Sequence, residues 1–269
     1  MNATPPAHAL DSPSRAAVSV RNLRMGYGER VLLENVSFDV RSKEIVVILG
    51  GSGSGKSSLM KTLTGLYPPL AGDVLINGIS LVHAPADERA ALQRTLGVMY
   101  QSGALFGSLT VLQNVRFPLD CFTDLPLEQK NLTVRMLLHT LEMQQAEALM
   151  PGELSGGMLK RVAIARAMAL GCEILLLDEP SAGLDPVTAA NLDRTLLSLR
   201  KALGVTLIVV THELESIFAI ADRAIMLDPS SRAIIADGRP SVLRDHNADA
   251  RVHQFFNRQP DARHASRFG

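Results

Sequence analysis

The chain has 269 residues, of which 46% are hydrophobic and 20% are charged, and this length is enough to bury one substantial core. Its 27 Lys and Arg residues balance its 27 Asp and Glu residues, so the formal net charge is zero. A neutral chain has no basic field that would attract nucleic acid or anionic lipid by itself, which argues against a protein that acts mainly on nucleic acid.

Neither a membrane span nor a secretion signal is expected. The apolar runs, such as residues 45–49 and 174–177, have the length of strands and fall far short of the roughly 20 residues that a spanning helix needs. Residues 1–16 are rich in Ala, Pro and Ser and lack the features of a signal peptide, so we expect a flexible tail and a cytoplasmic protein. Cys121 and Cys172 stand far apart without metal-ligand spacing, and free thiols are expected.

The first elements along the chain are strands. Alternating apolar and polar residues between positions 18 and 40 predict two short antiparallel strands, and residues 44–49 predict a strand buried on both faces of a parallel sheet. A glycine-rich loop follows, and then a helix whose apolar side carries Leu59, Leu63 and Leu66. Residues 74–81 predict a β-hairpin, because Asn77 and Gly78 favour a tight turn.

The middle of the chain, residues 106–170, is expected to be helical and to hold no strong strand. Its apolar set is Leu132, Leu137, Leu138 and Leu141. Strands and helices then alternate: strand 174–177, helix 186–203, strand 205–210, helix 213–221, and a closing hairpin at 225–227 and 233–236. Residues 248–269 predict a short amphipathic helix and a polar end. We therefore expect an α/β fold at residues 17–247, with a parallel sheet, an N-terminal antiparallel β part and a helical insertion.

A glycine-rich segment between a predicted strand and a predicted helix fits the phosphate-binding P-loop pattern in full. Its residues, with the serine that follows, are Gly50, Gly51, Ser52, Gly53, Ser54, Gly55, Lys56, Ser57 and Ser58. The glycines let the backbone wrap phosphates, and N–H groups at the helix N-terminus supply positive potential. Lys56 is expected to reach the outer phosphates of ATP, and the Ser57 hydroxyl to bind Mg²⁺. A glycine-rich turn without a ligand is the structural alternative.

Two adjacent carboxylates follow the apolar strand at residues 174–177. Asp178 is expected to hold the Mg²⁺ shell, and Glu179 is then placed to orient or deprotonate the attacking water. The alternative is that the pair only caps the next helix. Together with a complete P-loop, the pair predicts an enzyme that hydrolyses a nucleoside triphosphate.

The segment from Leu154 to Met158 reads Leu-Ser-Gly-Gly-Met and stands just before a predicted helix. Here the chain resembles the ABC ATPase family, whose signature sequence is LSGGQ. Ser155 and the N–H groups of Gly156 and Gly157 are expected to form a second anion site at a helix N-terminus. The resemblance implies the ABC ATPase fold and a homodimer in which this segment faces the γ-phosphate held by the other subunit. A bare turn that caps a helix is the alternative.

Four further residues match elements of that family. Tyr27 resembles the aromatic residue that stacks on adenine, although an ordinary aromatic residue at a strand end is the alternative. Gln101 resembles the glutamine that touches Mg²⁺ and water and signals to the membrane partner. Asp185 matches a loop that crosses the dimer interface, and it also fits a helix cap before Pro186. His212 resembles the histidine that contacts the γ-phosphate, where a lone histidine would otherwise be structural.

Over residues 18–257 the resemblance has two departures. Gly51 stands where many relatives have proline or asparagine, a change that we expect to be harmless. Met158 replaces the signature glutamine and removes a polar side chain near the facing nucleotide. Since Ser155 and Gly157 remain, we expect ATP hydrolysis to persist.

Residues 101–106 and 155–158 together resemble the ATPases of Mce/Mla-type lipid transporters, which are phospholipid-trafficking systems of bacteria. That resemblance implies a membrane permease, an Mce-domain lipid-binding protein and sometimes a STAS-domain protein as partners, at the cytoplasmic face of the inner membrane. An importer ATPase for small polar solutes shares every catalytic motif and stays open. An ABC ATPase of DNA repair, chromosome maintenance or translation is a further alternative, although no coiled-coil arm, zinc module or second ATPase domain is visible.

Leu105 and Phe106 follow Gln101 and lead into the helical insertion. They are expected either to line a groove for a cytoplasmic helix of the permease or to pack the insertion against the sheet.

Overall fold

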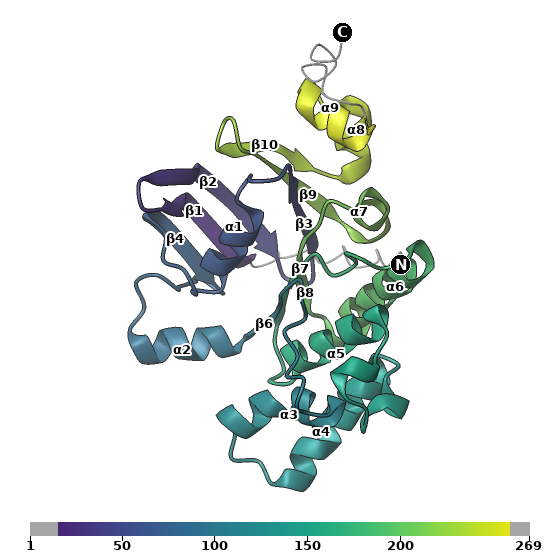
Figure 1. Ribbon diagram of the computed structural model, residues 1–269. Helices are drawn as coiled ribbons and strands as arrows, with labels where there is room; N and C mark the ends of the chain where they lie inside the picture. The colour runs from purple at the N-terminus through teal and green to yellow at the C-terminus, as the bar shows by residue number, and fades with distance from the viewer. Residues whose placement is uncertain (1–15, 259–269) are drawn as a thin grey trace, which may run out of the picture.

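Two β-sheets form the centre of the computed structural model of the protein, which describes residues 16–258 (Figure 1). The first sheet has the order β2-β1-β4-β5, with β1 at Ala16–Tyr27, β2 at Arg30–Arg41, β4 at Ala71–Ile76 and β5 at Ile79–Ser80. The second has the order β10-β9-β3-β8-β7-β6, with β3 at Ile45–Gly50, β6 at Leu96–Met99, β7 at Ile174–Asp178, β8 at Thr206–Val210, β9 at Arg223–Asp228 and β10 at Ala233–Gly238. The predicted N-terminal tail, apart from Ala16, and the predicted polar end after residue 258 lie outside the described residues.

The first sheet is antiparallel. The sequence predicts two short strands at its start, but β1 and β2 each extend over 12 residues. Register shifts interrupt their pairing, so a period-of-two pattern conceals the full length. The predicted hairpin is confirmed: between β4 and β5, Asn77 and Gly78 take φ values of 52° and 85°, the left-handed geometry that a two-residue turn requires.

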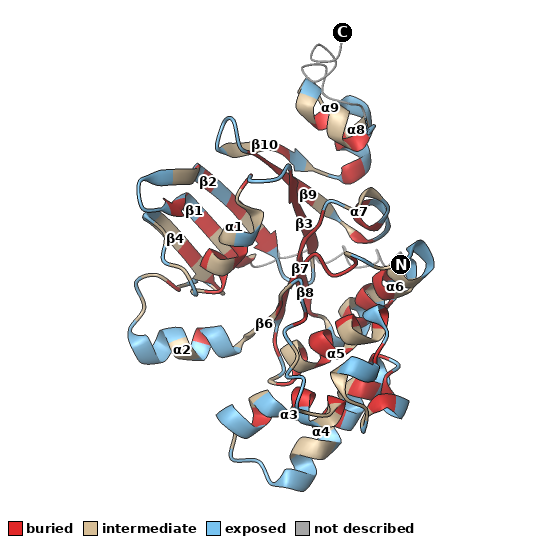
Figure 2. Cartoon of the chain, viewed as in Figure 1, coloured by how far each residue is buried: buried red, intermediate tan, exposed pale blue. Residues whose placement is uncertain are grey.

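In the second sheet, β9, β3, β8, β7 and β6 are parallel neighbours, and β10 is antiparallel at one edge. Every residue of β3, β7 and β8 is buried, which explains why these strands are almost entirely apolar (Figure 2). Parallel strands end at the same edge of a sheet. The segments that follow β3, β6, β7 and β8 therefore meet at one edge.

Separate apolar cores lie on the two faces of the second sheet. On one face, α1 (Lys56–Leu63) and the first sheet pack on the sheet, while α5 (Gly156–Met168), α6 (Pro186–Leu203) and α7 (Leu214–Ile220) cover the other (Figure 1). The predicted apolar side of α1 is wrong at Leu66. The helix ends at Leu63, Gly65 takes a left-handed φ of 69°, and Leu66 is 64% exposed.

The insertion at residues 106–170 is helical, as the sequence predicts. It holds α3 (Val111–Phe122), α4 (Leu127–Thr140), two short 3₁₀ turns (Gln144–Ala146 and Pro151–Glu153) and α5, with α3 and α4 at the end farthest from α8 and α9 (Figure 1). Of the apolar set that indicated this helix, Leu138 and Leu141 are buried, whereas Leu132 is 60% exposed. The buried Asn114 amide donates to the carbonyls of Phe106 and Leu109 and so ties the start of the insertion to α3.

Two helices close the described chain. The predicted amphipathic helix is confirmed as α9 (Ala250–Phe256), in which Val252 and Phe256 are buried. The sequence does not predict α8 (Pro240–His246) or, before β6, α2 (Ala86–Arg94). No helix between residues 16 and 258 is long and apolar enough to cross a membrane. Cys121 and Cys172 are free thiols, as expected.

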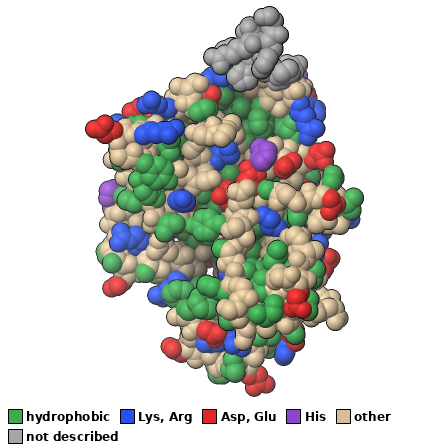
Figure 3. All heavy atoms as spheres, in the orientation of Figure 1, with side chains coloured by type: hydrophobic (Ala, Val, Ile, Leu, Met, Phe, Trp, Pro, Cys, Tyr) green, Lys and Arg blue, Asp and Glu red, His purple; other side chains and the backbone are tan. Residues whose placement is uncertain are grey.

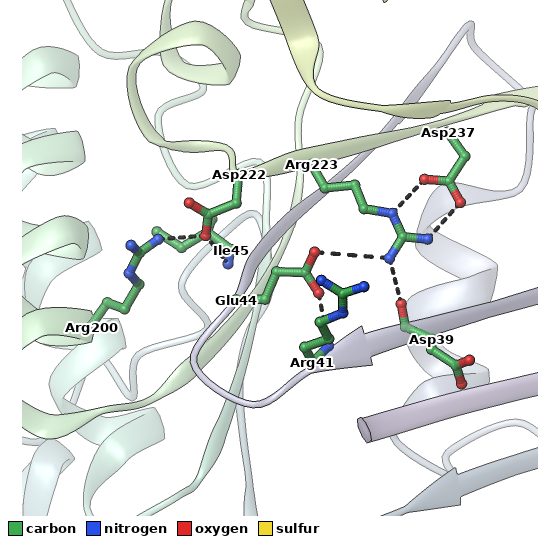
Figure 4. Close-up of polar contacts among 8 residues, drawn as sticks. All are labelled: Asp39, Arg41, Glu44, Ile45, Arg200, Asp222, Arg223 and Asp237. Atoms are coloured by element: carbon green, nitrogen blue, oxygen red, sulfur yellow. Dashed lines mark hydrogen bonds and ion pairs between the residues drawn. The ribbon is translucent and has the colours of Figure 1, made fainter. Parts of the chain in front are cut away.

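Ionic contacts anchor the start of β3, at the end opposite the glycine-rich loop (Figure 4). Asp222 accepts from the Ile45 backbone N–H at 2.9 Å and from Arg200. Arg223 pairs with Asp237 on β10 and donates to the Asp39 carbonyl of β2 at 2.8 Å. These contacts join the two sheets and hold the strand that carries the loop.

Candidate active site

The glycine-rich loop connects β3 to α1, as predicted. Gly50 and Gly55 take positive φ values of 149° and 92°. A Cβ atom on Gly50 would stand 2.3 Å from the Leu227 carbonyl oxygen, so a larger residue does not fit there. The Lys56 ammonium donates to the carbonyls of Gly50 and Gly51 at 2.8 and 3.1 Å, which places its charge over the loop.

A cavity of about 470 Å³ opens at this loop. It is lined by Tyr27, Arg30, Leu32, residues 52–58, Gln101 and Glu179. The Tyr27 ring is 42% exposed, packs against Tyr67 with 4.7 Å between ring centroids, and places its hydroxyl 3.1 Å from the Ser58 hydroxyl. The structure thus brings Tyr27, the loop, Gln101 and Glu179 to one cavity. Arg30, Leu32 and Tyr67 belong to no sequence motif, so the sequence alone does not indicate them.

Asp178 and Glu179 lie where β7 ends, and both are buried. Among the described residues, Asp178 Oδ1 and Glu179 Oε2 have no hydrogen-bond partner. Burial raises the pKa of Asp178, and the neighbouring Glu179 raises it further, while a hydrogen bond from Ser57 opposes the change. Buried carboxylate oxygens without a protein partner, beside a serine hydroxyl, are the ligands that Mg²⁺ prefers. Ser57 and Asp178 therefore fit a magnesium ion.

The backbone of Glu179 is held in an unusual conformation. Its φ is 48°, in the left-handed region that non-glycine residues rarely adopt, and its N–H donates to the Val210 carbonyl at 2.8 Å. This geometry directs Oε1 to His212, whose Nδ1 lies 2.8 Å away. The sequence predicts both residues but not the contact between them, because it depends on β7 and β8 being neighbours.

Gln101 follows β6 and is exposed toward the cavity. Its backbone carbonyl accepts a hydrogen bond of 2.6 Å from Lys160, which also donates to the Glu179 carbonyl at 3.3 Å. Burial lowers the pKa of Lys160, although Glu179 and Asp178 oppose this change. Lys160 stands two residues after the signature segment, and no sequence motif indicates a role for it.

The signature segment forms the start of α5. Ser155 is the N-cap, and its hydroxyl accepts from the Met158 N–H at 3.4 Å. Ser155 and Gly156 are exposed, whereas a Cβ atom on Gly157 would stand 2.5 Å from Thr188. None of the three belongs to the residues that line the cavity at the glycine-rich loop.

Asp185 caps α6, as one of its two predicted roles requires. Its carboxylate accepts from the N–H groups of Val187 and Thr188, both at 3.0 Å. Like Ser155, it stands outside the lining of the loop cavity. The predicted nucleotide contacts of one chain therefore form two groups, one around the loop and one at the starts of α5 and α6.

Basic and acidic side chains are interspersed over the face that Figure 3 shows. This distribution agrees with the balanced charge of the sequence.

The model of the ABC transporter family matches residues 33–182. The chain is 36% identical over 240 residues to the Escherichia coli K12 intermembrane phospholipid transport system ATP-binding protein MlaF, covering 89% of this chain and 88% of MlaF. It is also 36% identical to the methionine import ATP-binding protein MetN of Carboxydothermus hydrogenoformans, covering 78% of this chain and 63% of MetN. A solved dimeric ATP-binding cassette, in a post-hydrolysis state bound to ADP and Pi, matches with a TM-score of 0.74 and 30% identity, covering 82% of this chain and 98% of that one.

Proposed function

The chain belongs to the ABC transporter family as an ATPase that powers transport, and we propose that it acts as a homodimer that drives phospholipid transport by a separate membrane permease. Within this proposal, residues 17–247 form the nucleotide-binding domain, and residues 106–170 form its helical part. Residues 248–269 follow it as a C-terminal extension.

One observation carries the proposal of a shared site: the candidate nucleotide contacts of a single chain form two separate groups. Tyr27, Lys56 and Glu179 surround the loop cavity, while Ser155 and Asp185 do not. Two copies related by a twofold axis can place the second group of each chain against the first group of the other. The match to a dimeric cassette bound to ADP and Pi supports this arrangement.

At each shared site, the chain's own residues take distinct parts. The backbone N–H groups of the loop and Lys56 bind the phosphates of ATP, and Ser57, Gln101 and Asp178 hold Mg²⁺, which neutralises charge on the phosphates. Glu179 takes the proton of the attacking water. The contact of 2.8 Å from His212 Nδ1 to Glu179 Oε1 orients the carboxylate for this step.

The proposal of a phospholipid cargo rests on the similarity to MlaF together with the signature and glutamine segments. The match covers nearly the whole of both chains, at 89% and 88%. An importer of small polar solutes is the second candidate, supported by the match to MetN, although this chain spans only 63% of that protein.

The permease contact is proposed at Phe106. Leu105 packs against the main core, so the structural alternative holds for it. Phe106, by contrast, is 44% exposed. Its ring packs against that of Phe117 at a tilt, with 4.8 Å between centroids, and the Arg166 guanidinium lies over it at 5.7 Å. An exposed aromatic pair offers an apolar surface to a short helix of the permease.

Isolation of the native complex tests this function. The expected result is a membrane permease and an Mce-domain protein, with or without a STAS-domain protein, together with phospholipid extracted from the complex. The complex should therefore localise to the cytoplasmic face of the inner membrane. A complex that instead contains a soluble solute-binding protein and no lipid would favour the importer of small polar solutes.

A further inference from the structure

A lysine side chain inside the protein joins three of the motifs described above. Lys160 on α5 is only 8% exposed, an uncommon place for an ammonium group. It donates to the Gln101 carbonyl at 2.6 Å and to the Glu179 carbonyl at 3.3 Å. These carbonyls follow the ends of β6 and β7, which are paired in the sheet. Lysine suits this position because it has three donors and no acceptor.

The left-handed backbone of Glu179 explains why such a contact matters. A non-glycine residue in this region stores strain and persists only when its surroundings hold it. On one side the Glu179 N–H is bound by the Val210 carbonyl at 2.8 Å. On the other side its carbonyl is bound by Lys160. Without the hydrogen bond from Lys160, the orientation of the Glu179 carboxylate is less well fixed.

The same helix also carries Ser155, its N-cap, five residues before Lys160. At about 1.5 Å of rise per residue, the two positions are only about 7 Å apart along the helix axis. Ser155 is exposed and stands outside the loop cavity of its own chain, whereas Lys160 is buried and binds the carbonyls of two residues that line this cavity, Gln101 and Glu179. One rigid helix therefore joins Ser155 to the carbonyls of Gln101 and Glu179.

We propose that Lys160 is a positioning residue that couples the two ATP sites of the dimer. ATP on the facing subunit fixes the start of α5 through Ser155, and Lys160 then holds Glu179 and Gln101 of its own site in their working positions. This inference rests on the proposed shared-site dimer. It assigns to Lys160 no contact with ATP.

The test compares Lys160→Met with the parent protein and with Arg161→Met. Methionine keeps the length of the side chain but has no donor. Arg161 is the next residue on the helix, and it binds Glu142 and the Leu141 carbonyl, away from the site. For each protein, kcat, KM and the Hill coefficient for ATP are measured, together with binding of a fluorescent ATP analogue.

In Lys160→Met we expect kcat to fall by about tenfold or more, because a small displacement of a catalytic group lowers the rate steeply. The dissociation constant of the ATP analogue should stay within about threefold of the parental value. The Hill coefficient should fall toward unity. Lys160→Arg, which keeps donors and charge, should recover much of the lost rate, while Arg161→Met should behave as the parent. If Lys160→Met does not fold, Lys160→Gln replaces it, because its shorter side chain cannot reach both carbonyls.

Folded Lys160→Met or Lys160→Gln protein with the parental kcat and Hill coefficient would overturn the inference, and so would an equal loss in Arg161→Met. Failure of the underlying function gives a different result. In that case the parent protein itself shows no cooperativity and no ATP-dependent dimer.

Discussion

Replacement of Glu179 by glutamine isolates the proton transfer from the binding of ATP. The amide has nearly the same shape, so the contact to His212 Nδ1, at 2.8 Å in the parent, keeps a partner. The contacts of Lys56 and the loop with phosphate lie on other elements and are unchanged. What is lost is the ability to accept a proton from water.

A positioned general base contributes about 10²- to 10⁴-fold to a rate. At about 1.4 kcal/mol for each factor of ten, Glu179→Gln is expected to raise the barrier by about 3 to 6 kcal/mol. Because ATP still binds but is not consumed, the dimer should also stay closed. Single-turnover hydrolysis measures the first effect, and size-exclusion chromatography with ATP measures the second.

Glu213→Gln is the matched control. Glu213 also approaches His212, with 3.7 Å from Nε2 to its carboxylate, but its side chain is 46% exposed, whereas that of Glu179 is 11% exposed. This variant should hydrolyse ATP at the parental rate. If Glu179→Gln retains a rate within about threefold of the parent, the assignment of Glu179 as the base is wrong.

Three further variants have separate readouts. Because burial raises the pKa of Asp178, the ionised carboxylate destabilises the fold at neutral pH, and this destabilisation disappears as the pH falls. Asp178→Asn should therefore raise the melting temperature of the nucleotide-free protein and abolish Mg²⁺-dependent hydrolysis. An unchanged or lower melting temperature would contradict the destabilising effect of the carboxylate. Tyr27→Ala should raise the KM for ATP by about tenfold with little change in kcat, as expected for the loss of one stacking contact, and a selective loss of kcat would contradict this role. Phe106→Asp should weaken permease pull-down by about tenfold, equivalent to about 1.4 kcal/mol, without changing the melting temperature. Leu105→Asp should instead lower the melting temperature, because it buries an unpaired charge. The reverse pattern would assign the permease contact to Leu105 and the packing role to Phe106.

The order of the elements could be predicted because the buried strands are recognisable in the sequence as apolar segments. β3, β7 and β8 are almost entirely apolar, and each is followed by residues of a recognisable motif. Their common direction then brings Lys56, Glu179 and His212 to one edge of the sheet without further information. The roles of these residues in ATP hydrolysis remain predictions.

What the sequence did not indicate depends on contacts between distant segments. Lys160 reads as one more charged residue on a helix, and only the position of α5 against β6 and β7 makes it buried. Leu132 and Leu66 satisfy an apolar spacing, yet the first faces solvent and the second follows the end of its helix. α2 buries only Leu92 and therefore has little apolar periodicity to detect.

Mixing two inactive variants tests the shared site most directly. Lys56→Ala disables the phosphate contacts of its own chain, and Ser155→Arg blocks the facing site, so each homodimer should be inactive. A heterodimer of the two has one site with both defects and one site with neither. At equal mixing, half of the dimers have one intact site, so recovery can reach at most about a quarter of the parental ATPase rate. The proposed coupling through Lys160 would lower this value further, because the other site of the heterodimer binds no ATP that could fix α5. No recovery on mixing, or hydrolysis at the parental rate by protein that stays monomeric with ATP, would contradict the account.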